Sequence, residues 1–431
     1  MSISQLEVST PLSANAQAIL LLTAPLITGR GESSKELLTL SEYGKLARFL
    51  YENKYQPADL VAVGETELFL ELGRIVNSDR LKRLVGRGFL LSQAIERWQA
   101  RAIWVVSRAD EGYPTRLKER LKEMAPPVLY GCGDSSILDG GGLAVVGSRH
   151  ADAEVLESAS RVGELAARAR SNIISGGARG IDQAAMSGVL DGGGKATGVL
   201  ADGLERAALN RDHRNYLREG QLVLVSPYDP QAGFNVGNAM QRNKVIYALA
   251  DAALVVQSDY GKGGTWAGAT EQLDKLRLVP VYTLSKSQSD AAFESLSKKG
   301  ALSWPNPTTA EGFSEALAAG LARRSSLDSE QLSFSADNGN HADRVPDEQK
   351  LPDTSSEADG PDTPPDEQLF ATVKVLFARL DAPKTDKEIA DELKVTKPQV
   401  KEWIKRLIKE GALEKLSAPT RYRATKSSKL F

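Results

Sequence analysis

Short apolar runs that alternate with helix-length amphipathic segments constrain the fold of this 431-residue chain more than any other feature. Val155, Ala159 and Val162, between the first two runs, recur at helical spacing. The runs cover residues 143–146, 173–175, 196–200, 222–225, 252–256 and 279–282. Strands buried on both faces and separated by helices are typical of βαβ units. Residues 136–323 are therefore predicted to form an α/β domain with a doubly wound parallel sheet.

The region before this domain, residues 1–135, has a different pattern. Leu37, Leu40, Tyr43 and Leu46 recur at near-helical spacing, as do further apolar residues up to Leu50. One strand-like run, residues 102–106, comes late in the region. The N-terminal region is therefore predicted to be mostly helical.

The chain changes composition again after the α/β domain. Residues 325–368 contain twelve acidic residues against two basic ones, with few apolar side chains. Such a segment cannot bury enough apolar surface to offset the entropy lost on ordering. Residues 324–368 are therefore predicted to be an acidic, disordered linker.

The last segment, residues 369–431, regains helical periodicity and becomes basic, with eleven Lys and Arg against three Glu from Lys394 onward. Residues 385–393 and 397–410 are predicted helices, and residues 413–423 can fold back as a β-wing. The expected buried stripe of the second helix is Val400, Trp403, Ile404, Leu407 and Ile408. This order predicts a winged helix. Its basic surface is either an ordinary solvated face or a contact surface for duplex DNA or a protein.

Cysteine content and hydropathy set limits on the class of protein. Cys132 is the only cysteine, which excludes a disulfide within the chain and a multi-cysteine zinc site. The apolar residues 18–22 are too few to span a bilayer. We therefore expect a cytoplasmic protein without membrane contact.

Three glycine-containing loops follow predicted strands: residues 147–149, 176–180 and 262–265. Each precedes a helix, whose free N–H groups and positive dipole end favour an anion. Arg149, Arg179 and Lys262 add positive charge, and residues 242–244 can line the same edge of the sheet. Glycine can occur in such a turn for steric reasons alone. Three glycine-containing loops at one edge, each with its own cation, instead favour an anion-binding site.

Known catalytic motifs are missing from these loops. The chain contains neither GxGxxG nor the P-loop GxxxxGK[ST], and its histidines and acidic residues are not clustered at metal spacing. It has no serine nucleophile elbow. We therefore expect no catalytic residues, no metal and no cofactor. Cations spaced along one edge suit a threaded polyanion better than a mononucleotide. Phe234 is either a base-stacking residue or a packed aromatic.

The ordered motifs resemble those of the DNA-processing protein A family (DprA/Smf). They include Gly112-Tyr113-Pro114, Val146-Gly147-Ser148-Arg149, the run from Ser175 to Asp182, and Arg242-Asn243-Lys244-Val245-Ile246. The resemblance implies an extended Rossmann-like fold and a single-stranded DNA-binding recombination mediator. It further implies that the protein hands DNA to a RecA-type recombinase. Members of this family are commonly homodimers and often carry a C-terminal winged helix.

The resemblance also indicates which residues contact DNA. It places Arg149, Arg179, Arg242, Asn243 and Lys244 in the groove. The full set of expected DNA-binding residues is Gly147, Ser148, Arg149, Ser175, Gly176, Gly177, Arg179, Phe234, Arg242, Asn243, Lys244, Lys262, Gly264 and Thr265.

The loop at Lys262 leaves an alternative function open. Its sequence Lys262-Gly263-Gly264-Thr265 is similar to the PGGxGTxxE loops of cytokinin-activating phosphoribohydrolases in the wider superfamily. The proline is missing here, and Glu271 falls six residues after Thr265 rather than three. The alternative is a nucleotide-processing enzyme or a sensor of a nucleotide-derived signal.

Overall fold

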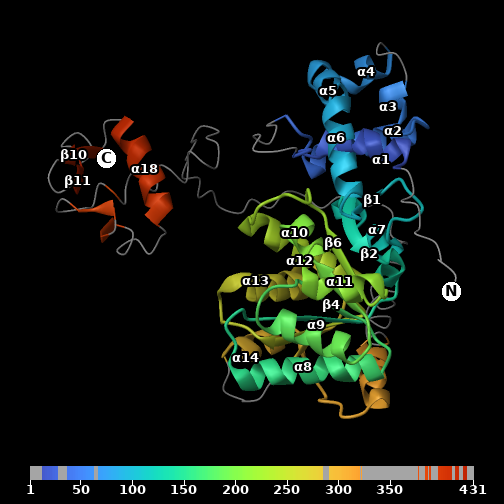
Figure 1. Cartoon of the computed structure of the whole chain (residues 1–431), viewed down its shortest axis with the longest axis vertical. Helices are drawn as coiled ribbons and strands as arrows, with labels where there is room; N and C mark the ends of the chain where they lie inside the picture. The colour runs from blue at the N-terminus through green and yellow to red at the C-terminus, as the bar shows by residue number, and fades with distance from the viewer. Residues whose placement is uncertain are drawn as a thin grey trace, which may run out of the picture. The chain divides into compact units, whose positions relative to one another are not determined.

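The computed structural model describes residues 12–27, 36–62, 67–284, 291–320, 322, 377, 384–386, 388–389, 397–409, 413–416 and 421–424. The chain divides into two compact units, Met1–His341 and Ala342–Phe431. Figure 1 shows helices α1–α6 gathered at one end of the first unit and α8 at the other. None of the helices in these described ranges combines the length and the apolar character needed to cross a membrane.

A nine-stranded sheet forms the centre of the first unit, in the order β1-β2-β6-β5-β4-β3-β7-β8-β9. The pairs from β6 to β9 are parallel, as predicted, whereas β2 runs antiparallel to β6 and β1 antiparallel to β2. The strands are β1 Trp104–Ser107, β2 Val128–Gly133, β3 Leu143–Gly147, β4 Ile173–Ser175, β5 Ala196–Val199, β6 Leu222–Ser226, β7 Ala252–Gln257, β8 Val281–Thr283 and β9 Leu302–Ser303.

Helices cover both faces of this sheet. Along β3, Leu143 and Val145 belong to one buried cluster and Ala144 and Val146 to the other, as the period-2 geometry of a strand requires. The helices of this region are α7 Thr115–Leu121, α8 Ala153–Arg168, α9 Ile181–Asp191, α10 Leu204–Ala208, α11 Arg211–Arg218, α12 Val236–Leu249, α13 Gly263–Glu271 and α14 Ala291–Lys298, with a π-helix η3 Gln272–Leu276 and 3-10 helices η1 Lys122–Met124 and η2 Ser135–Asp139. The doubly wound fold is therefore confirmed.

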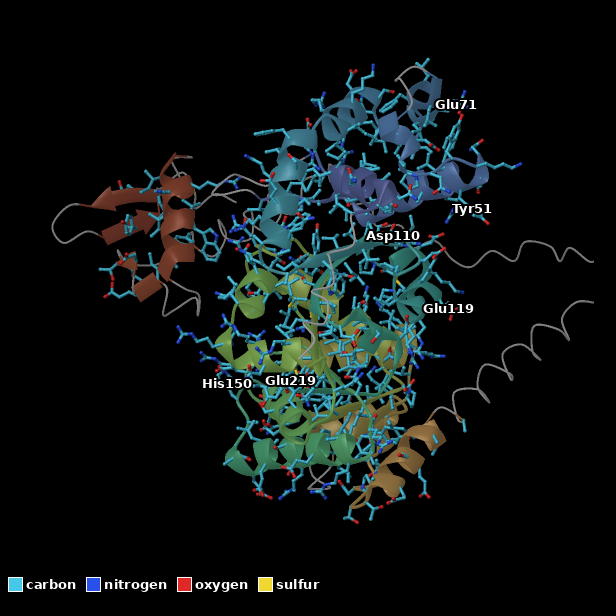
Figure 2. The ribbon with its side chains drawn as sticks, turned by 45° about the vertical axis from the view of Figure 1, so that its right-hand side comes forward. Tyr51, Glu71, Asp110, Glu119, His150 and Glu219 are labelled. Atoms are coloured by element: carbon cyan, nitrogen blue, oxygen red, sulfur yellow. The ribbon has the colours of Figure 1, made fainter. Side chains whose placement is uncertain are left out.

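The N-terminal helices pack on the β1–β2 end of the sheet. They are α1 Ala14–Thr23, α2 Leu40–Glu52, α3 Asp59–Ala62, α4 Glu67–Leu72, α5 Ser78–Val85 and α6 Gly88–Gln99. Trp98 of α6 meets Tyr130 of β2 edge to face, with 5.1 Å between ring centroids. Asp110, labelled in Figure 2, accepts a 2.5 Å hydrogen bond from the Ser13 hydroxyl before α1. These contacts join the helical region to the sheet within one unit.

The β2 strand was not predicted from the sequence. Its residues follow Pro126-Pro127 and include Gly131 and Gly133, which weaken a strand signal. Gly131 is nevertheless required, because a Cβ there would lie 2.3 Å from the Trp104 ring. Packing against β1 therefore determines this strand.

The second unit contains α18 Lys397–Lys409 followed by the antiparallel hairpin β10 Leu413–Leu416 and β11 Arg421–Ala424. Val400, Ile404 and Leu407 are buried as expected, but Ile408 is 39% exposed and lies at the edge of the stripe. The predicted linker 324–368 and most of the predicted helix 385–393 lie outside the described residues.

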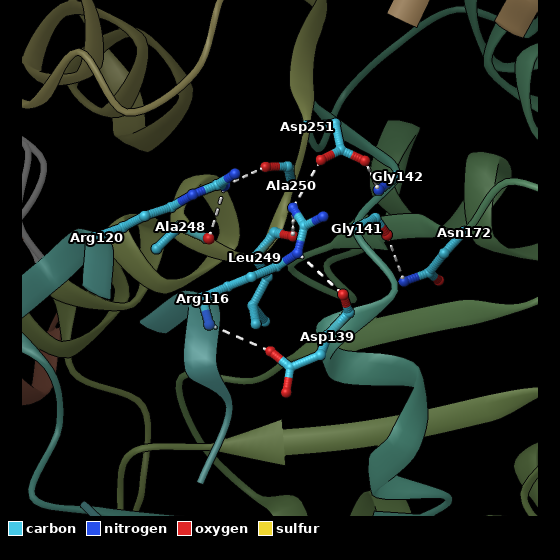
Figure 3. A network of polar contacts seen from close by, with 10 residues as sticks. All are labelled: Arg116, Arg120, Asp139, Gly141, Gly142, Asn172, Ala248, Leu249, Ala250 and Asp251. Carbon is cyan, nitrogen blue, oxygen red and sulfur yellow. Dashed lines mark hydrogen bonds and ion pairs between the residues drawn. The ribbon is translucent and has the colours of Figure 1, made fainter. Parts of the chain in front are cut away.

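A polar network holds the amino-terminal edge of the sheet (Figure 3). Arg116 of α7 donates to Asp251 Oδ1 at 2.6 Å and to the Asp139 carbonyl at 3.0 Å. Asp251 Oδ2 accepts from the Gly142 amide at 2.8 Å. Because Gly142 precedes β3 and Asp251 precedes β7, this guanidinium fixes where two central strands begin.

We predict that Arg116→Ala lowers the free energy of unfolding by about 2 kcal/mol, because the partly buried Asp251 loses a charged hydrogen-bond partner. Urea unfolding followed by tryptophan fluorescence measures this change. Arg161→Ala is the matched control, because the Arg161–Glu157 pair has side chains 57% and 66% exposed. The control should change stability by less than about 0.5 kcal/mol. Equal losses in both variants would show that the network has no special role.

Candidate nucleic-acid interface

The loops that follow β3, β4 and β5 surround one pocket of about 940 Å³. Parallel strands place these loops at the same edge of the sheet, where open α/β folds bind ligands. His150, labelled in Figure 2, is among the residues that line it. The lining consists of Arg149, His150, Gly176, Gly177, Ala178, Arg179, Leu200, Ala201, Asp202, Gly203, Arg206, Ala207, Asn210, His213, Phe234 and Arg242.

Arg242 of α12 lies deepest among the pocket cations, with only 7% of the residue exposed. Its Nη1 donates a hydrogen bond to the Val199 carbonyl at the end of β5. Asp182 of α9 is equally buried and accepts a 3.1 Å hydrogen bond from the Gly176 amide, so it braces its own turn. A Cβ at Gly176 would lie 2.2 Å from Arg242 Nη1 and 2.7 Å from Asp182 Oδ2. Only glycine fits between the two charged groups.

Burial acts on both members of this pair. It raises the pKa of Asp182 and lowers the pKa of Arg242, while the charge of each group opposes the shift of the other. The Nε atom of Arg242 has no hydrogen-bond partner among the described residues. The base of the pocket therefore retains a buried guanidinium with one unsatisfied donor, an environment suited to an anion.

Arg149 and Arg179 are exposed at the pocket. The Arg149 guanidinium carbon lies 5.3 Å from the centroid of the Phe234 ring, within the range of a cation–π contact. Phe234 is 54% exposed although it is a large apolar residue. The rim thus offers two cations and one open aromatic face.

The remaining predicted residues make contacts within the edge rather than lining the pocket. Thr265 Oγ1 donates to the Gly147 carbonyl at 2.9 Å, and Asn243 Nδ2 donates to the Gly264 carbonyl at 3.2 Å. These bonds connect the start of α13 to β3 and α12. The same loops include Ser148, Ser175 and Lys262. The Ser175 hydroxyl is buried and donates a 2.6 Å hydrogen bond to the Val145 carbonyl.

Lys244 has an acidic partner that the sequence did not indicate. Its Nζ lies 3.3 Å from Glu271 Oε1, and its side chain is 16% exposed. Part of its charge is therefore already balanced within the protein. Lys244 presents less free positive charge to a ligand than the exposed Arg149 or Arg179.

Sequence reasoning missed the wall formed by residues 200–213, including Arg206, Asn210 and His213. The signal for it was available, because Asp202-Gly203 follows the predicted strand 196–200 at the same sheet edge. Gly203 adopts a left-handed conformation with φ of 60° directly before α10. This turn directs α10 and α11 alongside the pocket.

Two curated proteins are similar to this chain in sequence. The chain is 31% identical over 161 residues to the DNA processing protein DprA of Streptococcus pneumoniae, covering 36% of this chain and 54% of that protein. It is 28% identical over 216 residues to Protein Smf of Synechocystis sp., covering 48% of this chain and 52% of that protein. The chain thus spans about half the length of these relatives.

A solved structure and a family profile complete the comparison. The X-ray structure of DprA from Streptococcus pneumoniae has a TM-score of 0.53 and 21% sequence identity, covering 70% of this chain and 96% of that one, which supports the fold. The profile of the family described as DNA recombination-mediator protein A matches residues 104–311, which include the central sheet and the pocket. Residues 104–311 of the chain, slightly less than half of its length, therefore match the model of the DNA recombination-mediator protein A family.

Proposed function

We propose that this protein binds single-stranded DNA at the carboxyl edge of its sheet and acts as a recombination mediator. The observation that carries the proposal is the pocket in which Arg149, Arg179 and the buried Arg242 converge beside the exposed Phe234. Cations neutralise phosphates, and an exposed aromatic ring offers a stacking surface to a base of any sequence. Single strands present both groups, whereas the bases of a duplex are already stacked on one another.

The family relationship supports the biological role. We propose that the bound strand is passed to a RecA-type recombinase in the cytoplasm, and that the protein acts as a homodimer without a cofactor. The family name and the DprA and Smf relatives support a role in recombination. We further propose that the C-terminal unit contacts duplex DNA or a partner protein through its basic residues.

The alternative, a nucleotide-processing enzyme, would require a free carboxylate near the α13 loop. Glu271 lies at the far end of α13 and faces Lys244 Nζ at 3.3 Å. We therefore favour binding over catalysis.

We predict that Arg149→Ala and Arg179→Ala each weaken binding to a labelled single-stranded oligonucleotide, because each removes an exposed cation from the pocket. Fluorescence anisotropy should show a loss of about 1–3 kcal/mol, or about 5- to 150-fold, for Arg149→Ala, which also removes the partner of Phe234. Lys244→Ala should have a smaller effect because of Glu271.

The control for these variants is again Arg161→Ala, an exposed arginine on α8 outside the pocket. Arg242 is a poor test residue, because its buried contacts link binding to folding. Wild-type affinity in the double variant Arg149→Ala/Arg179→Ala would overturn the proposed site.

We predict that the protein releases no free base from nucleoside monophosphates at enzymatic rates. Chromatography of the products measures this reaction, with Glu271→Ala as the matched variant. Turnover in the wild type that Glu271→Ala abolishes would favour the enzyme.

We predict that deleting residues 369–431 leaves single-strand affinity within about tenfold, or about 1.4 kcal/mol, because the pocket lies entirely in the first unit. Duplex affinity should fall more. A folded, truncated protein that no longer binds single strands would place the site elsewhere.

A further inference from the structure

Helix α11 carries a set of arginines that the family motifs do not include. Its sequence RDHRNYLR contains Arg211, Arg214 and Arg218 but only one acidic residue, Asp212. All three arginines are exposed. Within the part of the chain that the structure describes, none of the three forms an ion pair. We call these three residues the arginine stripe.

Helical geometry places the arginine stripe on one face of α11. Residues at positions i, i+3 and i+7 fall within an arc of about 60°, and seven residues rise about 10 Å along the axis. Tyr216, on another face, donates its hydroxyl to Asp191 Oδ1 at 2.8 Å. Leu217 packs towards Gly133 of β2. The packed side of α11 is thus directed at the protein, and the arginine stripe is left to solvent.

The arginine stripe begins where the pocket ends. Asn210, the N-cap of α11, and His213 in its first turn both line the pocket, and Arg211 lies between them in sequence. Arg206 of α10 lines the same wall and is 85% exposed, with Asp202 as a distant partner at 3.6 Å. Positive charge therefore continues from the pocket onto α11 without an intervening acidic cluster on this helix.

We infer that the arginine stripe is a second contact for the phosphate backbone, over which a single strand continues after it leaves the pocket. Three guanidinium groups over about 10 Å can each engage a phosphate oxygen. This inference rests on the proposed function of the pocket. It adds to that function a contribution of α11 that depends on the length of the DNA strand. A short strand held in the pocket does not reach the arginine stripe.

The test replaces the arginine stripe with Arg211→Gln/Arg214→Gln/Arg218→Gln in the full chain, since glutamine preserves helix propensity. Anisotropy is measured with oligonucleotides of about 6 and about 20 nucleotides over a range of salt concentrations. We expect at least about a tenfold loss for the longer strand at low salt. Each lost phosphate contact should lower the slope of log K against log salt concentration by about 0.7. Loss of all three contacts should therefore make this slope shallower by about 2. The shorter strand should change by less than about twofold.

The matched control is Arg161→Gln/Arg168→Gln/Arg170→Gln, which removes the same charge from three exposed positions: one in the middle of α8, one at its end and one just after it. Equal losses in this control would reduce the effect to net charge and overturn the inference. Unchanged affinity of the stripe variant for the longer strand would also overturn the inference. An equal loss of affinity for the shorter and the longer strand would overturn it as well. Tighter binding by the stripe variant would also overturn it. If the wild type binds neither strand, the proposed function itself fails.

Discussion

The burial of Arg242 beneath the carboxyl ends of β4 and β5 is the constraint on which the pocket depends. A guanidinium with 7% exposure must have partners, and here they are the Val199 carbonyl and the neighbouring Asp182 charge. Asp182 in turn accepts a hydrogen bond from the Gly176 amide. The glycine turn, the end of β5 and α12 are thus fixed around one buried charge, and the exposed cations Arg149 and Arg179 are positioned by that frame.

Much of the fold could be predicted from the sequence because its strands are buried on both faces. The runs 143–146, 173–175 and 222–225 are continuous apolar segments, and each became a strand with bounds shifted by at most one residue. The run 279–282 was shifted further, since β8 is Val281–Thr283. The strand β2 was missed because its stability comes from neighbours far along the chain, such as Trp104 over Gly131.

The candidate site was predicted less completely, for a different physical reason. Position after a strand placed Arg149 and Arg179 at one edge, the family resemblance added Arg242, and Phe234 was left open between a stacking and a packed role. All four line the pocket. Charge alone does not reveal which cations are already paired. The Lys244–Glu271 contact depends on the packing of α12 against α13, which no local pattern reports.

Helix α12 joins two regions that are otherwise distant. Its last residue, Leu249, lies within the Arg116 network, whereas Phe234, which lines the pocket, lies two residues before its first residue. Fourteen helical residues span about 21 Å, so the helix crosses the thickness of the domain from one sheet edge to the other. The helix that carries the buried Arg242 at the pocket is therefore bonded at its last residue to an arginine on the opposite edge.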